Sequence, residues 1–136
     1  MLLYNSAVSG NCYKVRLLAA QLGLPLELHE LSVVDRSNRA ELLGGLNPAL
    51  RVPTLVLDDG RPLGESNAIL WYLGDGTEYV PDDRYERAQV LQWQFFEQYA
   101  YTHVAPEGGF DLGPYPAIRA WLERVAGRPG HITIDA

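Results

Sequence analysis

In RVPTLVLDDGRPLGESN, residues 51–67, three structural signals follow one another. The β-branched and apolar run Thr54–Leu57 predicts a strand. Asp58-Asp59-Gly60 is a turn signal, so Arg61–Gly64 is expected to return as the partner strand of a hairpin. Ser66 is typical of a helix N-terminus, and apolar side chains at helical spacing follow it. The stretch therefore predicts a β-hairpin that leads directly into a helix.

The residues before this stretch predict two more strands and two more helices. Leu2–Tyr4 is a short apolar run, typical of a buried strand. Apolar residues at i, i+3, i+4 and i+7 within residues 15–22 predict a helix that ends at Gly23. The alternation over Leu26–Leu31 predicts a half-buried strand, and Asn38, followed by a glutamate at the third position, predicts a helix N-cap with its capping-box partner. The order strand, helix, strand, helix, hairpin, helix is that of an α/β thioredoxin-like fold.

The pattern that follows the third helix is purely helical. Residues 74–83 are polar and contain glycine and proline, as interdomain linkers do. We therefore expect a thioredoxin-like domain over residues 1–77 and a short all-helical domain over residues 82–136. The elements expected in the second domain are helices over Arg84–Tyr101 and Pro116–Ala126 and a loop over Pro106–Pro114. The first of these helices is apolar on two faces and needs packing partners on both.

Composition excludes several classes of function. The 136 residues carry a net charge of −6, which argues against a nucleic-acid partner, since phosphate binding requires clustered Lys and Arg. Cys12 is the single cysteine, so an internal disulfide or a multi-cysteine zinc site is excluded. The three histidines show no metal-ligand spacing. We expect no metal, no signal peptide, no membrane span and a cytoplasmic location.

Three segments together resemble the N-terminal, glutathione-binding domain of cytosolic glutathione transferases, closest to the serine-type members and their bacterial relatives. They are the Ser9 segment SGNCYKVR (residues 9–16), the Val-Pro segment NPALRVPT (residues 47–54) and the Glu-Ser segment GESNAI (residues 64–69). The resemblance covers residues 1–77 and resumes over residues 114–130. A Val-Pro pair alone is a weak signal, but followed at short range by Glu-Ser on this element order it is fairly specific.

The resemblance implies that Ser9 is the catalytic residue. A hydroxyl donor at a helix N-terminus would stabilise the thiolate of glutathione, because the helix dipole is positive there. The alternative is that Ser9 only caps the helix. Cys12 is interpreted as a packing residue, because thiol–disulfide oxidoreductases of this fold use Cys-x-x-Cys and the first of those positions is Ser9 here.

The remaining site residues are also assigned by resemblance. Val52-Pro53 would form a cis peptide bond that turns the backbone of Val52 outward to pair with the glutathione backbone. Glu65 would accept from the γ-glutamyl ammonium group, and Ser66, with its helix N-terminus, would hold the carboxylate. Arg51 and Asn38 match positions that reach the glycyl carboxylate. The alternatives are a loop proline, a serine cap with an acidic neighbour and, for Asn38, a helix cap alone. Lys14 and Arg16 are interpreted as solvated helix charges.

The second domain departs from the family. Five helices with their loops need about 80 residues, and residues 82–136 number 55. We infer an internal deletion with its junction near Glu97–Tyr101. Loss of these helices would leave aromatic side chains exposed and favour self-association, as a homodimer or in another form, including swapped helices. The aromatic residues concerned are Trp93, Phe95, Phe96 and Trp121.

Three functions follow from these observations. The first is a glutathione transferase that adds the glutathione thiolate to a small electrophile, with glutathione as co-substrate. The second is a non-catalytic glutathione-binding or dimerisation module of the same fold. The third is a glutathione-dependent thiol exchange enzyme that uses Cys12, which the absence of cysteine at position 9 disfavours.

Overall fold

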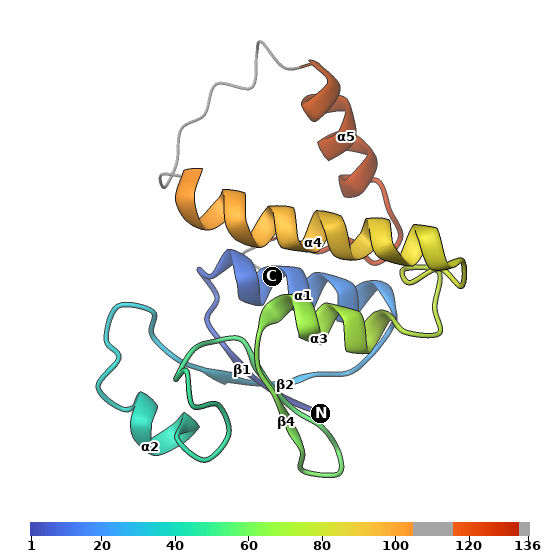
Figure 1. The fold of residues 1–136 in the computed structure, drawn as a ribbon. Coiled ribbons are helices and arrows are strands. Elements are labelled where there is room, and N and C mark those ends of the chain that lie inside the picture. Colours follow the sequence, from blue (N-terminus) through green and yellow to red (C-terminus); the bar gives the residue numbers. More distant parts are fainter. Residues whose placement is uncertain (105–115, 134–136) are drawn as a thin grey trace. The chain divides into compact units, whose positions relative to one another are not determined.

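The computed structural model describes residues 1–104 and 116–133, which form nine elements (Figure 1). In chain order they are β1 (Leu2–Asn5), α1 (Gly10–Gln21), β2 (Glu27–Glu30), α2 (Arg39–Leu43), β3 (Thr54–Val56), β4 (Pro62–Leu63), α3 (Ser66–Gly74), α4 (Arg84–Val104) and α5 (Pro116–Ala126). The chain divides into two compact units, residues 1–73 with the residues from Pro129 onward, and Gly74–Arg128. The loop predicted over residues 106–114 lies outside the described residues.

The first unit is built on a four-stranded sheet with the strand order β2-β1-β3-β4. β1 pairs with β2 in parallel and with β3 in antiparallel orientation, and β3 pairs with β4 in antiparallel orientation. Leu3 of β1 lies opposite Leu55 of β3, and both side chains are fully buried. This is the predicted thioredoxin-like arrangement, with a helical region after it, so the predicted fold class is confirmed.

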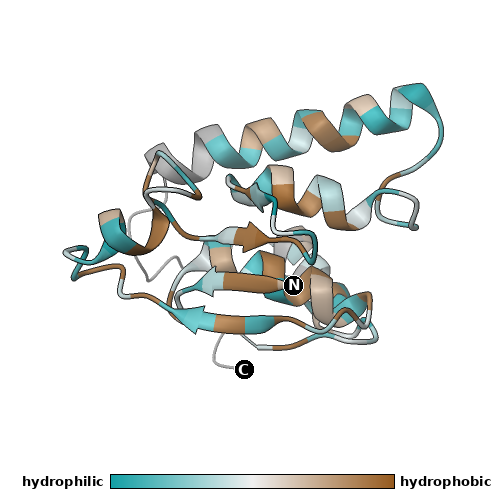
Figure 2. Ribbon diagram, turned by 90° about the horizontal axis from the view of Figure 1, so that it is seen from below, coloured by the Kyte–Doolittle hydropathy of each residue, from teal (hydrophilic) through white to brown (hydrophobic). Residues whose placement is uncertain are grey.

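The edge strand β2 differs from its prediction. All four of its residues are exposed, where a half-buried strand was expected. Figure 2 shows why, because β2 is mostly hydrophilic whereas β1 and β3 carry hydrophobic residues. A strand at a sheet edge has a neighbouring strand on one side only. The residue that follows β2, Leu31, is the one that is buried here.

The helices of the first unit complete its core. Val15, Leu18 and Ala19 of α1 are buried, as their spacing predicts, and α1 ends before Gly23, whose φ of 66° few other residues adopt. Leu43 of α2 and Ile69 of α3 are fully buried. Each helix thus contributes its apolar side chains to one core.

The C-terminal residues also belong to this unit, which the sequence did not predict. The hydroxyl of Tyr13 in α1 donates to the carbonyl oxygen of Ile132 at 2.7 Å. A Cβ on Gly130 would lie 2.7 Å from Cα of Gln21, so a side chain larger than hydrogen cannot fit there without movement. The last described residues therefore pack along α1.

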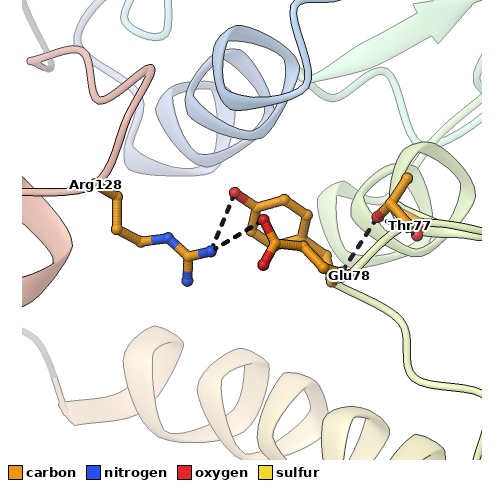
Figure 3. Close-up of polar contacts among 5 residues, drawn as sticks. Thr77, Glu78 and Arg128 are labelled. Atoms are coloured by element: carbon orange, nitrogen blue, oxygen red, sulfur yellow. Dashed lines mark hydrogen bonds and ion pairs between the residues drawn. The ribbon is translucent and has the colours of Figure 1, made fainter.

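The second unit begins with an ordered turn where a linker was expected. Thr77 Oγ1 donates to the carbonyl oxygen of Gly74 at 2.7 Å, and Val80 is buried. The guanidinium of Arg128 lies 3.6 Å from a carboxylate oxygen of Glu78 and 5.0 Å from the ring centre of Tyr79 (Figure 3). These contacts tie the end of the second unit to its beginning.

The two helices of the second unit match their predictions, with α4 longer by three residues. Asp83 begins α4, because its Oδ1 accepts from the backbone N–H groups of Tyr85 and Glu86, each at 3.0 Å. The expected exposure of aromatic side chains is confirmed. The exposed aromatic side chains of this unit include Trp93, Phe95, Phe96 and Trp121.

Candidate functional site

All three of the segments singled out in the sequence meet at one end of the sheet. The Ser9 segment follows the carboxyl end of β1, the Val-Pro segment leads into the amino end of β3, and the Glu-Ser segment follows the carboxyl end of β4. Because β3 is antiparallel to both β1 and β4, these three strand ends lie side by side. Segments distant in the sequence are therefore brought together by the topology.

Asn47 organises the Val-Pro segment. Its Nδ2 donates to the carbonyl oxygen of Arg51 at 3.2 Å and to Oγ1 of Thr54 at 2.9 Å, while its Oδ1 accepts from the N–H of Ala49 at 3.0 Å. Thr54 Oγ1 also donates to the Arg51 carbonyl at 2.8 Å. A buried amide with three partners fixes the course of this loop. Sequence reasoning did not assign this role, although an Asn-Pro pair is a turn signal.

The Val52–Pro53 peptide bond is cis, as predicted. Pro53 is buried and Val52 is half-buried. Within the described residues, the backbone N–H and C=O of Val52 form no hydrogen bond, which leaves both groups open to a ligand. The Arg51 side chain is exposed and has no polar partner in the described part of the chain.

A buried arginine supports the same loop from α2. Arg39 donates to the carbonyl oxygens of Leu50 at 3.1 Å and Ser32 at 2.7 Å, and burial lowers the pKa of its guanidinium. Leu50 has a φ of 53°, a left-handed conformation that a leucine keeps only when its surroundings hold it. Asn38 precedes α2, but its exposed side chain makes no capping hydrogen bond, so the predicted capping box is wrong. The carbonyl groups that bond to Arg39 anchor the start of the helix instead.

The Glu-Ser segment is arranged differently from the expected serine cap. The carbonyl oxygen of Glu65 accepts from the N–H of Ile69 at 3.0 Å, so Glu65 occupies the cap position and Ser66 is the first helical residue. Glu65 is exposed and has a φ of 63°, a second non-glycine residue in the left-handed region. Residues held in this conformation are concentrated at functional sites. The exposed carboxylate of Glu65 thus stands beside the N-terminus of α3.

Ser9 caps α1. Its Oγ accepts from the N–H of Cys12 at 3.4 Å, and its carbonyl oxygen accepts from the N–H of Tyr13 at 2.8 Å. The side chain is half-buried at the positive end of the helix dipole. The capping role is therefore present, and because Ser9 Oγ acts in it as an acceptor, it does not itself use the hydroxyl proton.

Side-chain hydrogen bonds join the N-terminal turns of α1 and α3. Ser66 Oγ donates to Oδ1 of Asn11 at 3.3 Å, and Lys14 Nζ donates to Oδ1 of Asn67 at 2.8 Å. Lys14 is thus not the simply solvated charge that was expected. The Glu-Ser segment also contacts the Val-Pro segment, because a Cβ on Gly64 would lie 2.9 Å from the side-chain nitrogen of Asn47. The three segments form one connected site.

A polar network holds the loop between β1 and α1. Asn5 Nδ2 donates to a carboxylate oxygen of Glu30, whose other oxygen accepts from the N–H of Ala7 at 3.1 Å. Arg16 donates to the carbonyl oxygen of Ala7 at 3.2 Å and is only 6% exposed, so the prediction of a solvated charge is wrong for this residue. The network fixes the loop that presents Ser9.

Cys12 is fully buried, and this burial raises the pKa of its thiol, although the hydrogen bond with Ser9 acts in the opposite direction. A raised pKa disfavours the thiolate that thiol exchange requires. The environment of Cys12 therefore fits a packing residue.

Other kinds of site have no support among the described residues. Residues 1–104 and 116–133 contain no group of three or more His, Cys, Asp or Glu side chains that could hold a metal ion. In the same ranges, no helix has the length and apolarity needed to cross a bilayer.

Comparison with known proteins points to one family. Residues 8–75 match the family model described as glutathione S-transferase, N-terminal domain. Glutathione S-transferase U10 of Arabidopsis thaliana is 37% identical over 70 residues, which cover 48% of this chain and 30% of that protein. Elongation factor 1-gamma of Artemia salina is 30% identical over 104 residues, which cover 76% of this chain and 23% of that protein. The chain thus spans less than a third of either curated relative.

A solved structure matches over nearly the whole chain. A possible glutathione S-transferase from Rhodopseudomonas palustris superposes with a TM-score of 0.88 at 38% identity. The match covers 99% of this chain and 97% of that one.

Proposed function

This chain belongs to the glutathione S-transferase family, and on that premise we propose that it binds glutathione at the three-segment site and transfers its thiolate to a small electrophile. The observation that carries the proposal is the convergence of the Ser9, Val-Pro and Glu-Ser segments at one sheet end. Each segment offers a group suited to a different part of the tripeptide.

The proposed pose follows from the open groups of the site. The unbonded backbone of Val52 pairs with the peptide backbone of glutathione, as an added strand does. Glu65 accepts from the γ-glutamyl ammonium group, and Ser66 with the N-terminus of α3 holds the adjacent carboxylate. The exposed Arg51 reaches the glycyl carboxylate, and the exposed Asn38 is available to the same group. The buried Pro53 maintains the shape of the loop.

The proposed transfer of the glutathione thiolate depends on one side chain of this protein, that of Ser9. Ser9 donates its hydroxyl proton in a hydrogen bond to the glutathione sulfur, which favours the thiolate at neutral pH. The N-terminus of α1 adds a positive partial charge at the same place. The thiol proton passes to solvent water. The thiolate then attacks the electrophile, and the leaving group departs with the electron pair of the broken bond.

Replacement of Ser9 by alanine tests the reaction. We expect Ser9→Ala to lower the rate of conjugation with a model aryl halide at least tenfold, because the thiolate loses its donor, while the dissociation constant for glutathione changes little. Ser9→Thr, which keeps the hydroxyl and the cap, is the matched control. Equal rates for Ser9→Ala and the native chain would remove Ser9 from the mechanism.

The second candidate is a glutathione-binding module with no catalysis. The similarity to elongation factor 1-gamma, which covers 76% of this chain, favours it. Glutathione binding with no conjugation of any electrophile, in both the native chain and Ser9→Ala, would identify this function.

We further propose a domain boundary between residues 77 and 82, an internal deletion near Glu97–Tyr101 and a homodimer that covers the aromatic side chains of the second unit. Phe95 is 72% exposed and Trp93 is 62% exposed. Water contact with such surface is unfavourable, so a second copy is the simplest cover. A reducing compartment such as the cytoplasm suits the free thiol of Cys12.

A further inference from the structure

The hydroxyl of Ser66 already has an acceptor within the protein. Ser66 is 4% exposed, and its Oγ donates to Oδ1 of Asn11 at 3.3 Å. A buried hydroxyl without a partner is unfavourable, so this bond satisfies Ser66 in the absence of ligand. The same bond occupies the single proton of the hydroxyl, which a ligand carboxylate would need as its donor.

The Ser66 proton therefore has two competing acceptors, the Asn11 amide oxygen and a ligand carboxylate. The Asn11 side chain can release the proton, because an amide offers both an acceptor and a donor. If the Asn11 amide turns over, its Nδ2 donates to Ser66 Oγ, and the Ser66 proton is released toward the ligand. Within the described residues, Asn11 Nδ2 has no other hydrogen-bond partner that would oppose the rotation.

We propose that Asn11 is a positioning residue that switches Ser66 between donation to the protein and donation to a ligand carboxylate. This inference rests on the proposed function, in which Ser66 holds the γ-glutamyl carboxylate. Asn11 acts through Ser66 and is not itself a catalytic residue. The consequence is a preference for a carboxylate over its neutral amide at this position.

The test compares glutathione with its analogue in which the γ-glutamyl α-carboxylate is a carboxamide, by isothermal titration. Asn11→Asp keeps an acceptor of the same shape but cannot donate, so it holds the Ser66 proton and repels an anion. We expect the native chain to favour glutathione. We expect Asn11→Asp to bind glutathione about ten- to a hundredfold more weakly, the effect of one charge-assisted hydrogen bond, and to lose the preference.

Asn67→Ala is the control for a merely structural role, because it breaks the bond with Lys14, which also joins the two helices, and leaves the side chains of Ser66 and Asn11 unchanged. It should keep the native preference. Asn11→Ala is a second variant, for use if circular dichroism shows that Asn11→Asp does not fold. It leaves the Ser66 proton free and should also keep the preference for glutathione. The inference is wrong if Asn11→Asp still prefers glutathione over the carboxamide analogue. It is also wrong if Asn67→Ala or Asn11→Ala loses that preference. Either result leaves the proposed function standing. No binding by the folded native chain overturns both.

Discussion

At the scale of single residues, the site depends on backbone conformations and polar bonds that a few side chains hold in place. Leu50 and Glu65 lie in the left-handed region, on either side of the cis Val52–Pro53 bond. Asn47 bonds to the Val-Pro segment and contacts the Glu-Ser segment at Gly64. Binding groups are thus placed by residues that themselves need no contact with a ligand.

Gly64 tests how tightly Asn47 is held. A Cβ at Gly64 would lie 2.9 Å from Nδ2 of Asn47, which cannot withdraw without losing its bonds to the loop. We expect Gly64→Ala to lower the free energy of unfolding by about 1–3 kcal/mol, measured by urea denaturation. Gly45→Ala, where no atom lies within 4 Å of the added Cβ, should change it by less than about 0.5 kcal/mol. Equal effects of the two substitutions would mean that Asn47 is free to move.

The thiol of Cys12 makes a pH-dependent contribution to stability. Its pKa is raised by burial, so the folded state holds the proton more tightly than the unfolded state. This contribution is present below the unfolded pKa of about 8.5 and is lost as the pH rises through the higher folded value. The stability advantage of the native chain over Cys12→Ala should therefore shrink between pH 8 and pH 10, measured by urea denaturation. An advantage that stays constant would mean that the thiol titrates normally.

At the scale of elements, periodic patterns predicted most of the helices and strands. The helices α1, α4 and α5 and the hairpin of β3 and β4 were predicted from apolar spacing and turn residues, because local chemistry determines them. The end of each element that depends on distant contacts was less predictable. Ser66 bonds to Asn11 rather than capping α3, because a tertiary partner takes its hydroxyl. Asn38 is exposed and caps nothing with its side chain.

The same limit applies to the candidate site. Resemblance identified the Ser9, Val-Pro and Glu-Ser segments and predicted the cis bond correctly. Arg39, Asn47 and Asn11 were missed, because an Arg or Asn in a polar run looks like a surface residue until the fold encloses it.

The N-terminus of α4 offers a test at this scale. Asp83 Oδ1 accepts from two backbone N–H groups at 3.0 Å, so Asp83→Ala removes both capping hydrogen bonds. We expect it to lower the free energy of unfolding by about 0.5–2 kcal/mol. Asp82→Ala, which removes an equal charge from the adjacent exposed position, should have less than half that effect in the same denaturation experiment. Similar losses for both variants would show that charge, not capping, matters here.

At the scale of the whole molecule, the unusual feature is a second unit with much exposed aromatic surface. Aromatic side chains each bury about 150–250 Å² when covered, and Trp93, Phe95 and Phe96 are all more than half exposed. We expect sedimentation equilibrium to show a mass that rises with concentration toward a dimer. Phe95→Ser should weaken this association at least tenfold, whereas Val34→Ser, at an 89% exposed position in the first unit, should not. A native chain that stays monomeric at high concentration would contradict the homodimer.

We propose that three segments, distant in the sequence, form one glutathione site. The decisive test is isothermal titration of the native chain with glutathione, with Arg51→Ala, Ser66→Ala as the matched double variant. We expect binding in the micromolar-to-millimolar range by the native chain and a loss of at least tenfold in affinity for the double variant. No binding by a natively folded chain, or equal binding by the double variant, would contradict it.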